Sequence, residues 1–265
     1  MSKMRNLHKL YYKDYYKGVE FSLDNKGVVK AKGSIVDIVK ESKVADGNVP
    51  APDFLSDRYS KEEPFYKSEF EVQYPGLVTG VGINHNVRRK ELTGEFKLGM
   101  HFDYTYGQPV IYGSSVKGVL RSYFKEEYGG EDADAIIADI FEGKDYQDRN
   151  TPLEKRRLKP MYERDVFFDA IVVGPNKKGK ILDADAIAPH GGDSHDNPFA
   201  EPVPIPFIKI ASGVKLLFRF KLNEIKQGDT VVMSADKKLK LFVKILTTYG
   251  IGAKTNVGYG QLKSV

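Results

Sequence analysis

A segment near the C-terminal end of the sequence, from Gly250 to Gly260, has the composition of a loop that binds anions. It reads GIGAKTNVGYG, with glycines at Gly250, Gly252, Gly258 and Gly260. Glycine permits positive φ angles and the close approach of another backbone, and successive free N–H groups in such a loop can surround an anion. Lys254, Thr255 and Asn256 add one cation and short hydrogen-bonding groups. The segment therefore predicts contacts with phosphate and sugar, the alternative being a helix C-cap followed by a structural turn.

The same segment resembles a nucleotide-binding P-loop only superficially. That motif needs G-x-x-x-x-G-K-[ST] at the start of a helix. Here Thr248 and Ala253 occupy the two glycine positions, and the segment follows a predicted helix instead of opening one. We therefore expect no ATP or GTP at this loop.

A second candidate is the predicted helix start that follows Pro109. Free N–H groups at a helix start attract phosphate, helped by the positive end of the helix dipole. A serine is expected to supply the N-cap, and two basic residues spaced i, i+4 share one face. The alternative is a capped amphipathic helix with a solvated basic face. The candidate binding residues are Gly113, Ser114, Ser115, Lys117 and Arg121.

The remaining residues that could do chemistry are histidines and acids. Residues 189–196 read PHGGDSHD, and their histidines and aspartates could ligate a metal. The His195-Asp196 pair also matches the dipeptide of HD phosphohydrolases, but a polar loop is the favoured interpretation, so we expect neither metal nor cofactor. His85 and His101 are lone candidates for a general acid or base, against the favoured interpretation of surface or partly buried histidines.

The composition is that of an ordinary globular chain. Of 265 residues, 41% are hydrophobic and 29% charged, and the formal net charge is +5. This basic excess permits a polyanionic partner without demanding one. The absence of cysteine excludes disulfides and thiolate metal sites. Without a long apolar run or a signal-like N-terminus, we expect a soluble cytoplasmic protein and no membrane partner.

The N-terminal third carries three predicted features. The helical spacing of Leu7, Leu10, Tyr11 and Tyr15 predicts an amphipathic helix that packs its tyrosines on the core, with base stacking as the alternative. Residues 19–32 predict a hairpin around the turn sequence DNKG. Residues 46–64 predict a long loop or insertion.

Apolar periodicity predicts the elements of the core. Alternating residues predict strands, and recurrence at i, i+3, i+4 predicts helices. Residues 181–200 are predicted as a loop, and the prolines of 201–207 predict an edge or polyproline segment. The last helix is expected to begin at Ser234, and Lys238 is expected to point mostly outward, like its neighbouring lysines. The elements are strand 96–104, helices 113–128 and 132–141, strands 166–173 and 214–222, helix 234–249 and strand 258–265.

The main elements run strand, helix, strand, strand, helix, strand. This is the ferredoxin-like βαββαβ arrangement of the α+β class, shared with the RNA recognition motif. We expect a single elaborated domain over residues 1–265, in which residues 1–70 form an N-terminal extension with a hairpin. The core, with its insertions, is expected over residues 75–265.

The two glycine-containing segments together resemble the RAMP superfamily of CRISPR-associated proteins. Members have a helix introduced by P-x-x-x-G-S-S-x-K-G-x-x-R, which residues 109–121 match, and a C-terminal G-φ-G, five residues, G-x-G loop, which residues 250–260 match. Ala188-Pro189-His190 and the EPVPIPF run at 201–207 are further similar to the sixth-subunit family of type III-B Cmr effector complexes. There the proline–histidine loop often continues with tyrosines, whereas here it continues GGDSHD.

The resemblance implies a ferredoxin-like core and a non-catalytic subunit that binds guide RNA (crRNA) near its 3′ end. The implied protein partners are the filament-forming RAMP subunit, a neighbouring head RAMP subunit and a small helical subunit, with target RNA contacted indirectly. Two alternatives stay open. One is a metal-independent endoribonuclease that uses His85 or His101 on a ribose 2′-OH; the other is a purely structural assembly subunit.

Overall fold

A six-stranded antiparallel sheet forms the centre of the described structure, a computed structural model. The structure describes residues 5–26, 29–44, 47, 49, 65–80, 82, 96, 99–148, 151–187 and 204–265. The order across the sheet is β12-β3-β9-β6-β4, and β5 also pairs with β9. The strands are β3 (Phe65–Val72), β4 (Val110–Ile111), β5 (Val166–Phe167), β6 (Ala170–Gly174), β9 (Lys215–Lys221) and β12 (Leu262–Ser264).

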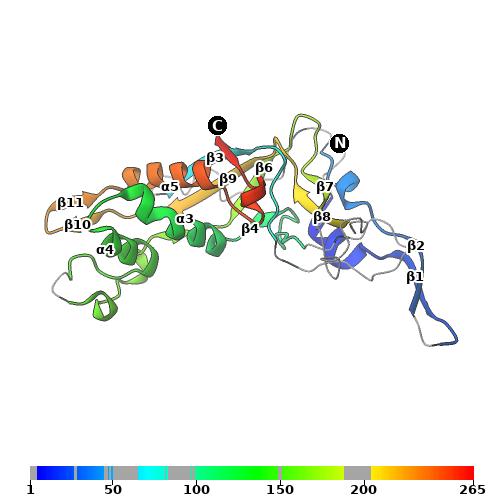
Figure 1. Cartoon of the computed structure of the whole chain (residues 1–265), viewed down its shortest axis with the longest axis horizontal. Coiled ribbons are helices and arrows are strands. Elements are labelled where there is room, and N and C mark those ends of the chain that lie inside the picture. Colours follow the sequence, from blue (N-terminus) through cyan, green and yellow to red (C-terminus); the bar gives the residue numbers. More distant parts are fainter. Residues whose placement is uncertain are drawn as a thin grey trace, which may run out of the picture.

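Two long helices, α3 (Gly113–Tyr128) and α5 (Ala235–Tyr249), pack against each other and cover one face of this sheet (Figure 1). In chain order, β3, α3, β6, β9, α5 and β12 give strand, helix, strand, strand, helix, strand. The sheet places β3 and β9 in the middle, as a ferredoxin-like fold requires. The predicted fold class is confirmed.

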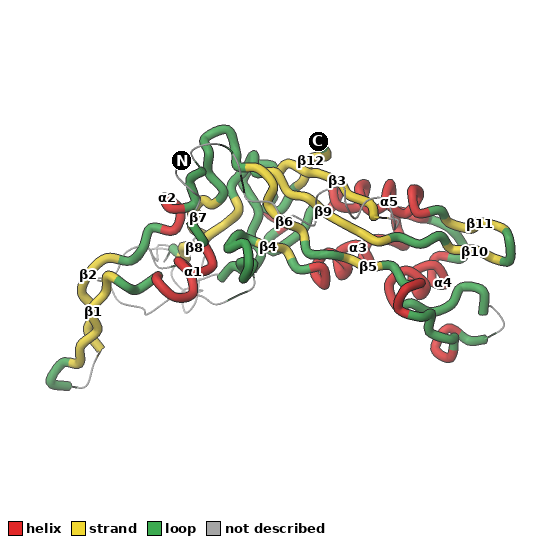
Figure 2. Tube along the Cα trace, turned by 180° about the vertical axis from the view of Figure 1, so that it is seen from behind, coloured by secondary structure: helices red, strands yellow, loops and turns green. Residues whose placement is uncertain are grey.

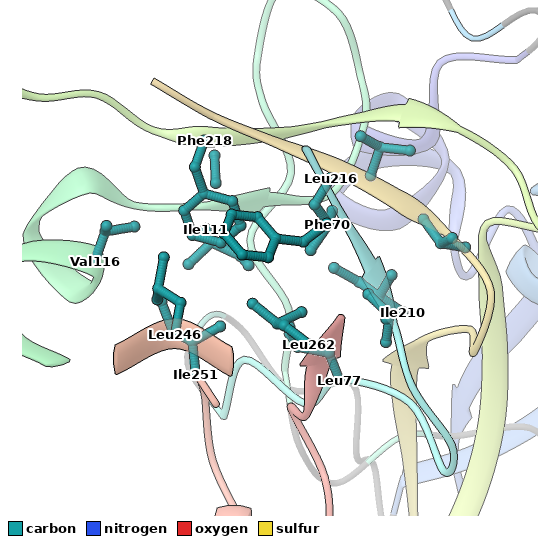
Figure 3. Packing of buried hydrophobic residues seen from close by; sticks show 14 of the residues in the cluster. Phe70, Leu77, Ile111, Val116, Ile210, Leu216, Phe218, Leu246, Ile251 and Leu262 are labelled. Carbon is teal, nitrogen blue, oxygen red and sulfur yellow. The ribbon is translucent and has the colours of Figure 1, made fainter. Parts of the chain in front are cut away.

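The core lies between the sheet and the two helices (Figure 3). Phe70 on β3 and Phe218 on β9 are fully buried, with ring centroids 5.1 Å apart. Leu246 of α5 and Val116 of α3 reach the same cluster from the helix side. Burying such apolar side chains is the main stabilising contribution to a fold of this kind.

The first core strand differs from the predicted one. It is β3 at Phe65–Val72, which begins before the expected core boundary at residue 75. Of the predicted strand 96–104, the structure describes residues 96 and 99–104, and none of these belongs to a strand of the sheet. Met100 and Phe102 are buried, so their alternation is real, but Phe102 makes only an isolated bridge to Pro109. Both residues instead contact the N-terminal helix: the Phe102 ring lies 5.0 Å from that of Tyr11, and the Tyr12 hydroxyl donates to the Met100 carbonyl.

A second, two-stranded sheet pairs β7 (Leu182–Ile187) with β8 (Ile205–Ile210). The predicted loop at 181–200 is therefore wrong over β7, where alanines and aspartates of low strand propensity obscure the pattern. The predicted edge segment is confirmed at residues 205–207, while residues 188–203 lie outside the described residues. Backbone hydrogen bonds between Leu77 and Ile210, 3.0 and 2.8 Å long, join this sheet to the core.

The structure confirms the helix and the hairpin that were predicted for the N-terminal segment. A short helix α1 (Leu7–Lys9) continues as a π-helical turn, Leu10–Asp14, and buries Tyr11 and Tyr15, which supports packing over base stacking. β1 (Gly18–Leu23) and β2 (Val29–Ser34) form the predicted hairpin, which projects away from the body (Figure 2). α2 (Ile38–Glu41) follows, and most of the predicted loop 46–64 lies outside the described residues.

Insertions extend the opposite end of the molecule. α4 (Ala133–Ile137) with its π-helical continuation, Ala138–Glu142, confirms the predicted second helix. Two 3-10 turns, Leu153–Lys155 and Met161–Glu163, lie in the charged stretch after it. The hairpin of β10 (Ile225–Gln227) and β11 (Thr230–Met233) precedes α5. Among the described residues, no helix is long and apolar enough to cross a membrane.

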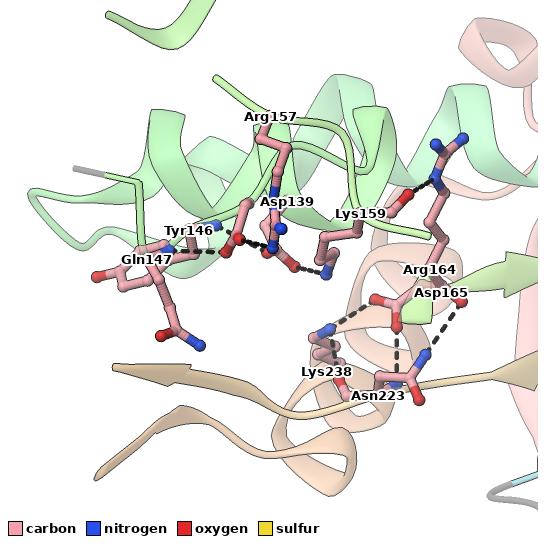
Figure 4. Close-up of polar contacts among 10 residues, drawn as sticks. Asp139, Tyr146, Gln147, Arg157, Lys159, Arg164, Asp165, Asn223 and Lys238 are labelled. Carbon is pink, nitrogen blue, oxygen red and sulfur yellow. Dashed lines mark hydrogen bonds and ion pairs between the residues drawn. The ribbon is translucent and has the colours of Figure 1, made fainter. Parts of the chain in front are cut away.

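Lys238 on α5 is fully buried, contrary to the prediction that it points outward. Its ammonium donates to the Asp165 carboxylate at 2.6 Å and to the Asn223 carbonyl at 2.7 Å (Figure 4). It shares the inward face because it precedes Phe242 by four residues and Ile245 by seven. Burial lowers the pKa of Lys238 and raises that of Asp165, although the attraction between the two charges opposes both shifts.

Candidate nucleic-acid interface

The glycine-rich loop joins α5 to β12 and is fixed at both ends by backbone hydrogen bonds. The Ile251 N–H donates to the Gly260 carbonyl at 3.0 Å, which closes the base of the loop. The Ala253 N–H donates to the Val78 carbonyl at 2.7 Å, and the Gly260 N–H donates to the Gly76 carbonyl at 2.8 Å. The segment after β3 therefore holds the loop along its length.

Two of the loop glycines are required by this close approach. Gly252 has φ +102°, and a Cβ there would lie 2.4 Å from the Val78 carbonyl oxygen. Gly260 has φ +75°, and a Cβ there would lie 2.0 Å from the Ile251 carbonyl oxygen. Side chains cannot occupy such space. Loop closure thus accounts for these two glycines, as the structural alternative expects, so the candidate binding groups are those at the tip of the loop.

The tip carries the geometry of an anion site. Lys254 adopts left-handed backbone angles, φ 63° and ψ 30°, and the right-handed 3-10 turn Thr255–Val257 follows it. A left-handed residue followed by a right-handed one turns successive N–H groups toward one concave side. Among the described residues, the N–H groups of Lys254, Thr255 and Asn256 find no acceptor, and Lys254 has no ion pair. The turn thus combines three available amides with a lysine that makes no ion pair among the described residues.

Tyr259 anchors the loop to the second sheet. Its hydroxyl donates to the Asp185 carboxylate at 2.8 Å, and the Lys209 ammonium donates to the same carboxylate at 2.5 Å. Its ring contacts Phe207 at 5.6 Å between centroids. Burial, and then the hydrogen bond to Asp185, raise the pKa of Tyr259 to about 12. The tip of the loop is therefore held next to a buried residue, Tyr259, that fixes the loop to the second sheet.

At the start of α3 the backbone packs closely. A Cβ at Gly113 would lie 2.1 Å from the Phe167 carbonyl oxygen, and the Gly113 N–H donates to Asp169 at 2.7 Å. The N-cap residue is Tyr112, whose side chain makes no cap hydrogen bond, so the predicted serine cap is wrong. The amide of Gly113 is consequently occupied, whereas Ser114 and Ser115 are exposed.

The two predicted basic residues of α3 lie away from the glycine-rich loop. Lys117 is displaced from Ser115 by roughly 200° around the helix axis. Its ammonium lies 5.9 Å from the Phe167 ring centroid, and Arg121 pairs with Glu142. Lys117 and Arg121 therefore share a face, as predicted, but this face differs from the one that meets the loop.

A pocket of about 140 Å³ joins the two predicted segments. Ser115 lines it from α3, and Gly252 lines it from the loop. Thr79, His101 and Tyr112 complete its polar and aromatic wall. No pattern in the sequence pointed to Thr79 or Tyr112, because a lone threonine or tyrosine has no characteristic spacing. The structure thus unites part of each predicted segment and adds residues from two others.

His101 is the one candidate acid or base that the described residues include. Its ring lies 4.4 Å from that of Tyr112, and burial lowers its pKa, which favours the neutral imidazole. His85 and residues 189–196 lie outside the described residues. Within the described ranges, no three acids or histidines gather as metal ligands.

A larger pocket, about 550 Å³, lies at the other end of the molecule beside the β10–β11 hairpin. Its charged lining is mostly paired internally. Lys159 donates to Asp139 at 2.6 Å (Figure 4), and Arg157 pairs with Asp145 at 3.0 Å. These pairs leave little unmatched charge for a ligand, so the loop and its adjoining pocket are the better candidate site.

Comparisons with known proteins agree with this architecture. The model of the RAMP superfamily matches residues 69–263. The CRISPR system CMR subunit Cmr6 of Saccharolobus solfataricus is 29% identical over 164 residues, which are 62% of this chain and 48% of that protein. The chain therefore spans about half the length of this relative.

A solved structure shares the fold. A chain of the Type III-B Cmr-beta bound to cognate target RNA superposes with a TM-score of 0.52 at 23% identity, covering 76% of this chain and 58% of that one. Cmr6 from Pyrococcus furiosus gives a TM-score of 0.38 at 22% identity, covering 76% and 98%. With its superfamily match spanning most of the sequence, the chain belongs to the RAMP superfamily of CRISPR-associated proteins and is similar to Cmr6.

Proposed function

We propose that this protein is a subunit of a type III-B CRISPR Cmr effector complex that binds the backbone of guide RNA through its glycine-rich loop. One observation carries the proposal: among the described residues, three successive amides, those of Lys254, Thr255 and Asn256, have no hydrogen-bond acceptor, and Lys254 makes no ion pair. Such a site suits a phosphate, and phosphate contacts position RNA without reading its sequence. Similarity to Cmr6 supports the assignment to a Cmr complex.

The partners that we propose are those that the family resemblance implies. They are crRNA near its 3′ end, the filament-forming RAMP subunit, a neighbouring head RAMP subunit and the small helical subunit, with target RNA reached indirectly. Lys117 and Arg121 would contribute on the separate basic face of α3, where Arg121 would have to exchange Glu142 for a phosphate.

We also propose that the subunit is not an enzyme. Cleavage at a ribose 2′-OH requires a base and an acid placed on opposite sides of the phosphate. Among the described residues, His101 has an aromatic neighbour, Tyr112, and no second histidine or carboxylate lines its pocket. Incubating the pure protein with repeat RNA tests this point, because defined cleavage that disappears in His101→Ala would make the subunit a nuclease.

The binding proposal is tested by measuring guide-RNA affinity against salt concentration. Lys254→Ala should weaken binding and reduce the slope of log K against log salt by about 0.7, the value for one phosphate contact on a single strand. Lys254→Gly removes the same charge but suits the left-handed backbone, so it should weaken binding without loss of stability.

Lys240→Ala is the matched control, because Lys240 is an exposed lysine of α5 far along the helix from the loop. It should leave both affinity and slope unchanged. The proposal is wrong if the Lys254 variants behave like the Lys240 control.

A further inference from the structure

The pocket between α3 and the glycine-rich loop has a lining that suits a neutral ring. None of its described lining residues is lysine, arginine, aspartate or glutamate. A phosphate or a metal ion would enter without a counter-charge there, which is unfavourable in a partly enclosed site. The floor is apolar, with Val119 among its side chains.

The size of the pocket sets the size of its occupant. The pocket encloses about 140 Å³. For comparison, an engineered apolar cavity of roughly 150 Å³ in another protein holds one benzene ring. A single six-membered ring therefore fits this volume, whereas a fused purine needs more. The aromatic wall formed by His101 and Tyr112 offers a surface for stacking, and Tyr112 is 39% exposed.

The polar groups on the wall can recognise the edge of such a ring. The Thr79 hydroxyl oxygen is buried and has no hydrogen-bond partner among the described residues, so its capacity to donate and accept is unused. Leaving a buried polar group unpaired is costly, and an entering group that pairs with it would recover that cost. Ser115 adds a second hydroxyl to the lining, and the neutral imidazole of His101 can both donate and accept.

The pocket also lies beside the proposed backbone site. Gly252, which lines it, precedes Lys254 by two residues in the same loop. A strand whose phosphate occupied the loop tip would thus have a neighbouring base within reach of the pocket. Unstacked bases held by aromatic side chains and edge hydrogen bonds are the usual mode of single-stranded RNA recognition.

We infer that this pocket holds one pyrimidine base of the bound RNA, stacked on the His101–Tyr112 wall and hydrogen-bonded by Thr79. The inference rests on the proposed function and deepens it: backbone binding becomes selective for a single-ring base at one position.

The test compares the affinities of oligouridylate and oligoadenylate of equal length for the full chain. The wild type should favour oligouridylate by about fivefold, the worth of one hydrogen bond. Thr79→Val keeps the shape and removes the hydroxyl, so the ratio should fall toward one while the protein stays folded. Val119→Phe fills the pocket and should abolish the preference as well.

Lys254→Ala separates the two proposals. It should lower both affinities alike and leave their ratio unchanged, because it removes a phosphate contact only. Equal affinities in the wild type, or a preference that survives in both Thr79→Val and Val119→Phe, would overturn the pyrimidine pocket while leaving backbone binding intact. If the wild type binds neither oligonucleotide, the proposed function fails and the pocket assignment falls with it.

Discussion

Tyr259 of the glycine-rich loop donates a hydrogen bond of 2.8 Å to Asp185 of β7, 74 positions earlier in the chain. This contact joins the loop of the ferredoxin-like core to the two-stranded sheet beside it. A loop that must present its amides at fixed positions gains from such an anchor, because less conformational entropy is then lost on binding. The loop and the second sheet therefore form one structural unit.

Replacing Tyr259 with phenylalanine should loosen this unit. The variant keeps the ring contact with Phe207 and removes the hydroxyl, so the free energy of unfolding should fall by about 1 kcal/mol. Urea denaturation measures this change, and RNA affinity should fall with it. Tyr162→Phe is the control, since Tyr162 is 69% exposed. Equal stabilities for the two variants would contradict the anchoring role.

The same contact predicts a pH dependence. Burial alone would raise the pKa of Asp185, but hydrogen bonds from Lys209 and Tyr259 outweigh it and hold the pKa below its ordinary value of 3.8. Because the folded pKa is the lower one, the fold favours the carboxylate. The contribution of the Asp185 carboxylate to the free energy of unfolding is present above the pKa that this group has in the unfolded chain. It is lost as the pH falls through the lower pKa of the folded protein.

The stability advantage of the wild type over Asp185→Asn should therefore shrink as the pH falls from about 6 to about 3. Urea denaturation at a series of pH values measures it. An advantage that stays constant over this range would show that the charge of Asp185 is not involved.

The buried pair of Lys238 and Asp165 should matter more for stability than any exposed pair. Lys238→Met leaves a buried carboxylate without its cation and should cost about 3–5 kcal/mol in the free energy of unfolding. Adding Asp165→Asn removes that charge, while its amide oxygen can still accept from the Asn223 N–H, so the double variant should recover much of the loss. Lys240 is exposed on the same helix. Lys240→Met should change stability by less than about 0.5 kcal/mol, as is usual for surface substitutions.

Urea denaturation measures the stability of each variant, and the decisive observation is whether the double variant is more stable than Lys238→Met alone. If the double variant is as unstable as Lys238→Met alone, the cost comes from lost packing of the lysine stem and not from an uncompensated charge.

Two glycines should respond to alanine in opposite directions. Gly252→Ala places a Cβ 2.4 Å from the Val78 carbonyl oxygen at a positive φ. This strain should cost about 2 kcal/mol or more and lower RNA affinity. A Cβ at Gly118 meets nothing within 4 Å on an exposed helical face, and Gly118→Ala should stabilise by about 0.5–1 kcal/mol. Thermal unfolding compares them, and a loss of stability in both would refute the distinction.

The sequence alone determined the elements whose pattern is local. The i, i+3, i+4 recurrence in α3 and α5, the start of α5 at Ser234 and the alternation of β9 need no distant partner to be recognised. The Ser234 hydroxyl does accept the Lys237 N–H, at 3.2 Å. The predicted order gave the ferredoxin-like class, although it placed the first strand at residues 96–104 and not at β3. The paired motifs sufficed for the superfamily.

Tertiary contacts decided what local patterns could not. Met100 and Phe102 are buried on alternate positions, a pattern that is the same whether they pack on a strand or on a tyrosine-rich helix. The alternation therefore predicted a strand, whereas the described residues from 99 to 104 form none. Lys238 carries a charge that predicts exposure, and its burial is permitted by two distant acceptors, the Asp165 carboxylate, 73 residues away, and the Asn223 carbonyl.

The candidate site divides in the same way. Lys254, Thr255 and Asn256 were predictable because glycines and a cation at close spacing are a local signal. The pocket was not, because Thr79, His101, Ser115 and Gly252 come from four separate segments. Their meeting depends on how the segment after β3 passes between the loop and the second sheet, and long-range packing of that kind leaves no periodic trace in the sequence.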